Sequence, residues 1–139
     1  MKFFDNLFDL NNRDEQLVTG LNKELNSVYV YDYFNKYNNN ILLVTNSLYE
    51  ANDLYNRLSN YTDRVLFFPM DDFITTVLTT SSPDLMVKRL ETLSLISNNN
   101  ENKIVVTNLE GFLKFVPKKD NIVNQDIVIK INDNFNLLI

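Results

Sequence analysis

The segment from Gln16 to Glu24 has the order of residue types expected of a phosphate-binding turn. A short apolar run leads into Thr19-Gly20, and a helical stretch follows at once. Such a cradle normally needs several glycines and a Lys-Ser or Lys-Thr pair, because backbone N–H groups and the lysine together hold the phosphates. The candidate positions here are Gly20, Asn22 and Lys23. One glycine cannot form a nest of N–H groups, and Glu24 would repel an anion. We therefore predict a degenerate phosphate loop that does not bind nucleotide, in which Gly20 permits a tight turn and Lys23 is solvated.

Composition excludes most familiar active sites. The 139 residues include no cysteine and no histidine, so the chain has no thiolate or imidazole to act as metal ligand or base. A net charge of -5 gives no general attraction for nucleic-acid phosphates. No apolar run approaches the roughly 20 residues that cross a bilayer, and Met1 to Asp5 does not begin a signal peptide. We expect about one domain, a cytoplasmic location and no membrane partner.

A second candidate for chemistry is the pair Asp71-Asp72, which follows an apolar run. Two adjacent carboxylates after a strand resemble a Mg²⁺-holding pair that orients nucleotide phosphates. Pro69-Met70 intervenes, however, and no intact phosphate loop accompanies the pair. A solvated loop that caps the following turn is the favoured interpretation, so no metal site is predicted.

Four short apolar runs alternate with amphipathic stretches, which predicts an α/β fold. The runs at 41–45 and 104–107 lack polar alternation, as is typical of parallel strands covered on both faces. We predict a three-layer parallel sheet flanked by helices. The predicted strands are Gln16 to Thr19, Ile41 to Thr45, Val65 to Phe68 and Ile104 to Thr107.

The intervening segments carry helix signals. Ser47 and Glu50 form a possible capping box before an apolar stripe that reaches Leu58. Ser82-Pro83 suits the start of a second helix, whose predicted apolar face is Leu85, Met86, Leu90, Leu93 and Ile96. A short helix is predicted from Leu109 to Phe115, before Pro117.

The segment from Lys23 to Tyr37 is ambiguous, because its β-branched and aromatic residues suit a strand on propensity. A crossover helix between two parallel strands is favoured by its position. Its aromatic side chains could stack on single-stranded nucleic acid, but Lys36 is the one basic residue among them. Core packing is therefore the favoured role. After Pro117, an alternating strand is predicted from Asp126 to Ile131.

Six motifs occur in an order that resembles a known family. They are Leu17-Val18-Thr19-Gly20-Leu21, Ile41 to Ala51, Phe67-Phe68-Pro69 with Asp71-Asp72, Ser82 to Met86, Arg89-Leu90, and Ile104 to Leu113. Together they resemble the amino-terminal end of bacterial transcription-repair coupling factor, a region similar to the first domain of excinuclease component B. The resemblance covers about residues 16 to 131.

The resemblance implies a degenerate P-loop NTPase domain of the RecA/helicase-like type, of which the chain holds the first part. It divides the chain into a lead-in segment at 1–15, the degenerate domain at 16–120, and the start of an inserted domain at 121–139. In the family, that inserted domain contacts excinuclease component A, through residues outside this chain. Excinuclease component B has an intact phosphate loop and a damage-probing hairpin, and both are missing here, since only Phe73 to Ser81 could form the hairpin.

The function that the resemblance implies is a non-catalytic scaffold in transcription-coupled nucleotide excision repair. This part would support recruitment of excinuclease component A to stalled RNA polymerase and would contact the rest of the coupling factor. The ATP- and Mg²⁺-dependent DNA translocase motor would lie beyond Ile139, so we expect no catalytic residue and no cofactor in this chain. The alternatives left open are a nucleotide-binding or damage-binding protein related to excinuclease component B, and an unrelated α/β adaptor.

Overall fold

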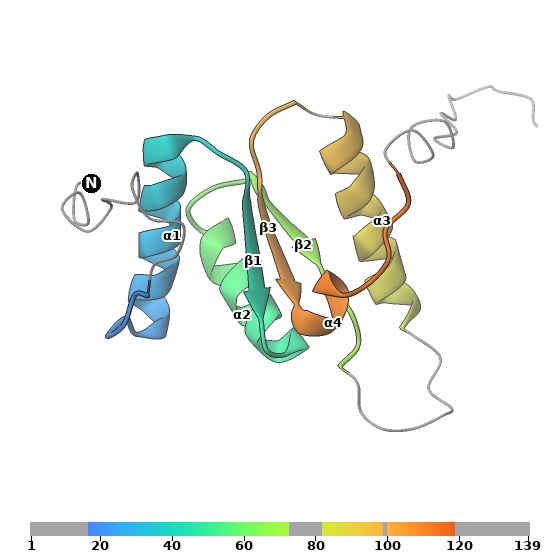
Figure 1. Cartoon of the computed structure of the whole chain (residues 1–139), viewed down its shortest axis with the longest axis horizontal. Coiled ribbons are helices and arrows are strands. Elements are labelled where there is room, and N and C mark those ends of the chain that lie inside the picture. Colours follow the sequence, from blue (N-terminus) through green and yellow to red (C-terminus); the bar gives the residue numbers. More distant parts are fainter. Residues whose placement is uncertain (1–16, 73–81, 99, 119–139) are drawn as a thin grey trace, which may run out of the picture.

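The computed structural model describes residues 17–72, 82–98 and 100–118. Within these ranges the chain forms alternating helices and parallel strands, which confirms the predicted α/β class (Figure 1). The elements are α1 (Lys23–Tyr37), β1 (Ile41–Thr45), α2 (Leu48–Ser59), β2 (Val65–Phe68), α3 (Pro83–Asn98), β3 (Ile104–Asn108) and α4 (Leu109–Phe112).

The three strands form one parallel sheet in the order β1-β3-β2. Ile104 of β3 is in register with Ile41 on one side and Val65 on the other. The chain moves across the sheet from β1 to β2 and then back to β3. Because such crossovers are right-handed, α2 and α3 cover opposite faces.

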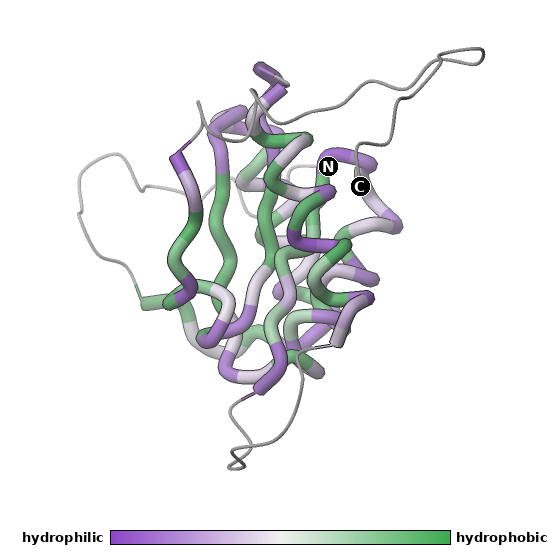
Figure 2. Tube along the Cα trace, turned by 90° about the vertical axis from the view of Figure 1, so that its right-hand side faces the viewer, coloured by the Kyte–Doolittle hydropathy of each residue, from purple (hydrophilic) through white to green (hydrophobic). Residues whose placement is uncertain are grey.

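The main core lies between the sheet and the two helices α1 and α2. Alternate strand residues point into it, including Val65, Ile104 and Val106, and they pack against Phe34 of α1 and Leu58 of α2. Coloured by hydropathy, the trace is most hydrophobic along the central strands (Figure 2). Burial of Phe34 confirms that the aromatic residues of α1 contribute to core packing.

Local signals set the helix ends. Ser47 Oγ accepts a hydrogen bond from Glu50 N at 3.2 Å, and Glu50 Oε2 accepts one from Asn46 N at 3.2 Å, so the predicted capping interaction is present. Helix α3 begins at Pro83, as predicted. Helix α1 ends at Tyr37, and its C-cap, Asn38, adopts a left-handed conformation with φ 46°.

The strand predicted at Gln16 to Thr19 is wrong for its three described residues. Leu17, Val18 and Thr19 form no strand, and the Leu17 side chain is 87% exposed. A strand needs a hydrogen-bonded neighbour, and no described strand pairs with this run. Helix α1 is present as predicted, but it does not connect two strands. Instead it packs on α2.

Two smaller differences concern the second half of the chain. The short helix predicted to reach Phe115 ends at Phe112. The strand predicted from Asp126 to Ile131 lies outside the described residues. No helix within the described ranges has the length and apolar character needed to cross a membrane.

Candidate functional site

The predicted cradle residues lie at the amino end of α1. This end of the helix and the carboxyl ends of the strands are at the same end of the molecule (Figure 1). Gly20 has φ +82°, which explains the choice of glycine at this turn, and no atom lies within 4 Å of the position of a Cβ. Asn22 is the N-cap of α1, since its Oδ1 accepts a hydrogen bond from Leu25 N at 2.8 Å. The cap thus engages one of the free N–H groups that would otherwise face an anion.

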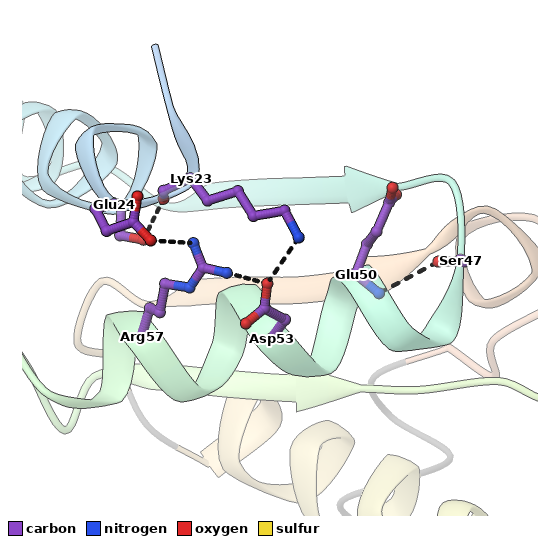
Figure 3. A network of polar contacts seen from close by, with 7 residues as sticks. Lys23, Glu24, Ser47, Glu50, Asp53 and Arg57 are labelled. Atoms are coloured by element: carbon purple, nitrogen blue, oxygen red, sulfur yellow. Dashed lines mark hydrogen bonds and ion pairs between the residues drawn. The ribbon is translucent and has the colours of Figure 1, made fainter.

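The Lys23 side chain is 67% exposed, as expected of a solvated lysine, and it also joins an ion-pair network between α1 and α2 (Figure 3). Its Nζ lies 3.7 Å from Asp53 Oδ2. Asp53 is also bonded to Arg57, whose Nη1 lies 3.9 Å from Glu24 Oε1. The network contains two cations and two carboxylates, so its formal charges cancel.

The electrostatics of this network favour the charged forms of Asp53 and Arg57. The hydrogen bond from Arg57, with the nearby charges of Arg57 and Lys23, lowers the pKa of Asp53. The same hydrogen bond, which Arg57 donates to Asp53, raises the pKa of Arg57. Asp53 is therefore a carboxylate at neutral pH, directly beside the lysine that a phosphate would need.

A hollow of about 260 Å³ lies beside the network, at the place where a cradle would open. Its lining includes Lys23, Glu50, Asp53 and Arg57, together with Thr45 at the end of β1. Two carboxylates thus share this hollow with the two cations. A phosphate in this hollow would have to compete with these carboxylates for Lys23 and Arg57.

The second candidate, Asp71-Asp72, lies at the carboxyl edge of the sheet, and both carboxylates accept hydrogen bonds from the protein. Asp72 Oδ1 accepts from Leu48 N at 2.8 Å, at the amino end of α2. Asp71 Oδ2 accepts from Ser82 N at 3.1 Å, just before α3. These contacts fit the interpretation of the pair as loop and helix-end caps. Among the described residues, no group of three or more acidic side chains could hold a metal ion.

Asn108 organises this edge and was not singled out by sequence reasoning. It is fully buried, and its Nδ2 lies 2.8 Å from Met70 O, 3.0 Å from Asp72 Oδ1 and 2.9 Å from Glu110 Oε2. Its Oδ1 accepts a hydrogen bond from Met70 N at 3.0 Å. The sequence signal for this role was an asparagine at the end of an apolar strand. A buried amide side chain needs both hydrogen-bond donors and hydrogen-bond acceptors as partners.

The fold and the two candidate regions define a small parallel α/β unit whose polar groups at the carboxyl edge largely engage one another. Comparison with known proteins shows that the chain is similar in sequence to transcription-repair coupling factors. The chain is 28% identical over 138 residues to the transcription-repair coupling factor of Staphylococcus haemolyticus, and 27% identical over 136 residues to that of Staphylococcus epidermidis. It is 25% identical over 136 residues to that of Staphylococcus aureus.

These alignments cover 96% to 98% of this chain but 12% of each relative. The resemblance to transcription-repair coupling factor predicted from the motif order is therefore confirmed, and the chain spans about an eighth of the length of these curated relatives. No protein-family model matches the chain, and no solved structure is significantly similar to it.

Proposed function

We propose that this chain is a non-catalytic scaffold of a transcription-repair coupling factor, acting in transcription-coupled nucleotide excision repair. Its role is to support the part of the protein that recruits excinuclease component A to stalled RNA polymerase. Contacts with RNA polymerase and DNA belong to the remainder of the protein, as does the ATP- and Mg²⁺-dependent motor.

The similarity to three staphylococcal coupling factors over almost the whole chain supports the assignment to transcription-coupled repair. The names of those relatives support the repair pathway. The scaffold role and the recruitment of excinuclease component A go further, and they rest on the family resemblance of the motifs.

The observation that carries the non-catalytic part of the proposal is the pairing of Lys23 with Asp53. Lys23 is the lysine nearest the predicted cradle, and its Nζ lies 3.7 Å from Asp53 Oδ2. Asn22 caps the helix, and Glu24 adds negative charge to its first turn. A triphosphate, which carries several negative charges of its own, would find Lys23 and Arg57 already paired with these carboxylates.

Calorimetric titration of the purified chain with ATP and Mg²⁺ tests this part. We expect no saturable heat of binding at any concentration below the millimolar range. The matched control is Lys23→Ala, which should give the same flat titration. Micromolar binding that Lys23→Ala abolishes would show a working cradle and would favour the nucleotide-binding alternative related to excinuclease component B.

A pull-down tests the recruitment part. Tagged excinuclease component A is offered the 139-residue chain, and separately a chimera in which the following segment of the Staphylococcus haemolyticus coupling factor is joined to it. We expect retention of the chimera and little retention of the chain alone. If the folded chimera is not retained, while the intact staphylococcal factor is, the scaffold role is contradicted.

A further inference from the structure

The segment that begins in α4 exposes aromatic and basic side chains together. Helix α4 lies at the carboxyl end of the sheet, directly after β3 (Figure 1). The Phe112 side chain is 54% exposed and the Phe115 side chain is 100% exposed. Lys114 and Lys118 are exposed as well. Aromatic rings and ammonium groups therefore alternate along residues 112–118.

Both lysines of this segment are available to a ligand. Within the part of the chain that the structure describes, no carboxylate forms an ion pair with Lys114 or Lys118. The acidic residue closest in sequence is Glu110, and its Oε2 accepts a hydrogen bond from Asn108 Nδ2 at 2.9 Å. The segment is thus locally basic, although the chain as a whole has a net charge of -5.

The first part of the segment is held firmly on the sheet. Gly111 is buried, and a Cβ at its position would lie only 2.3 Å from Thr107 Oγ1, so α4 packs directly against the end of β3. Leu113 N donates a hydrogen bond to Leu109 O at 3.1 Å, and Lys114 N donates one to Gly111 O at 3.2 Å. A backbone that is already ordered reduces the entropy that binding would cost.

We propose that residues 112–118 bind single-stranded nucleic acid. Exposed aromatic rings stack on bases, and lysines interleaved with them contact the phosphates. Protein interfaces are depleted in lysine, so two available lysines among apolar side chains fit nucleic acid better than a protein partner. The carboxyl end of a parallel sheet is also the end at which open α/β folds bind their ligands. The aromatic residues of α1 lack this interleaving, since Lys36 is the one basic residue among them.

Stacking and phosphate contacts are common to DNA and RNA and depend little on base sequence. We therefore expect similar affinities for oligothymidylate and oligouridylate. Because the rest of the chain is acidic, the dissociation constant should be only about 0.1 mM at low salt. This binding does not depend on the proposed repair function, and it is separate from the contacts that the motor would make with DNA.

Fluorescence anisotropy of labelled oligothymidylate and oligouridylate, each of about ten nucleotides, tests the aromatic part of the site. The full chain is titrated into each at about 20 mM salt. Phe115→Ala should weaken binding at least about fivefold, because one base then loses its stacking partner. The ring is fully exposed, so this substitution removes no packing. The matched control is Tyr49→Ala, which removes a 73% exposed ring from α2 and should change the affinity less than about twofold.

The salt dependence of binding tests the lysines separately. Two phosphate contacts predict a slope of about -1.4 when the logarithm of the association constant is plotted against that of the salt concentration. Lys118→Gln should change this slope to about -0.7. The matched control is Lys88→Gln, which removes the same charge from α3, where Lys88 Nζ lies 3.3 Å from Glu91 Oε2. This control should leave the slope unchanged, and far-UV circular dichroism checks that every variant is folded.

Three results would overturn the proposal. The first is the absence of saturable binding below about 1 mM at low salt. The second is equal weakening by Phe115→Ala and Tyr49→Ala, because binding would then not be localised to this segment. The third is loss of the retention of the chimera by excinuclease component A on Phe115→Ala, with the oligonucleotide affinity unchanged. That result would assign the segment to a protein interface.

Discussion

Gly111 offers the sharpest test of the packing at the carboxyl edge of the sheet. It is one of two glycines in the chain and lies buried in α4. A Cβ added there would lie 2.3 Å from Thr107 Oγ1, 3.0 Å from Phe68 O and 3.1 Å from Asn108 Oδ1. The substitution Gly111→Ala therefore forces a methyl group into a space already occupied by three oxygen atoms.

The loss of stability depends on the hydrogen bonds that the atoms around Gly111 would lose. Thr107 Oγ1 donates a hydrogen bond to Phe68 O at 2.6 Å, so its hydroxyl cannot move away without leaving a buried polar group unpaired. Overpacking costs about 1 to 3 kcal/mol, and an unsatisfied buried group about 1 to 3 kcal/mol. The helix preference for alanine returns about 1 kcal/mol. Together these terms predict a net loss of about 1 to 5 kcal/mol in the free energy of unfolding.

Urea unfolding followed by far-UV circular dichroism measures this loss. The slope for a small domain is about 1 to 3 kcal/mol per molar urea, so at a slope of about 2 the midpoint should fall by about 0.5 to 2.5 M. The control is Gly20→Ala, where the positive φ alone should cost about 1 to 2 kcal/mol and no clash exists. In a Thr107→Ala background, Gly111→Ala should cost clearly less, because the nearest atom is gone.

The reasoning would be refuted by a Gly111→Ala protein whose unfolding midpoint equals that of the original chain. It would also be refuted if Gly111→Ala cost the same with and without Thr107, because the clash would then not be the cause. A loss confined to Gly20→Ala would indicate that α4 does not approach the strand ends as closely as described.

Three further predictions concern the polar groups at the carboxyl edge. Asn108→Ala should lower the free energy of unfolding by about 2 to 4 kcal/mol in urea unfolding, because the N–H and C=O of Met70 lose their buried partner; a loss below about 0.5 kcal/mol would contradict the hub role. Asp72→Ala should cost about 1 kcal/mol through loss of the bond to Leu48 N, and Asp72→Asn, which keeps an acceptor oxygen, should cost less. The hydrogen bond from Arg57 lowers the pKa of Asp53 below its ordinary 3.8, so its stabilisation is present above about pH 4 and disappears as the pH falls through the folded-state pKa. Asp53→Asn should therefore flatten the acid side of the stability curve, and identical curves for the two proteins would count against the network.

The sequence predicted the elements better than their arrangement. Apolar runs and capping residues located the three strands of the sheet and helices α1, α2 and α3, because these signals are local. The order β1-β3-β2 could not be predicted, since it depends on which strands meet in space. The false strand at Leu17 to Thr19 came from the same kind of signal as the true ones, and only the lack of a neighbouring strand distinguishes it.

The candidate site, like the fold, was predictable in its residue types but not in its long-range contacts. Residue types alone indicated that Gly20 and Lys23 lack the glycines and hydroxyl partner of a phosphate loop. Residue types did not indicate that Asp53, thirty residues further on, would pair with Lys23. A contact between two helices cannot be recognised from the sequence of either helix alone. The same limit hid the bond between Asp72 and Leu48, in which a residue after β2 caps the helix before it.

The sequence pattern and the structure disagree on the face of β1 that carries Leu42 and Val44. The residue types of the strand itself explain this disagreement. Ile41 to Thr45 is apolar on both sides of the strand, as if both faces were buried, yet Leu42 and Val44 are exposed in the described residues. Exposed apolar side chains on a sheet face are a cost that a covering element removes. The pattern of β1 thus indicates that a further element covers this half of the sheet.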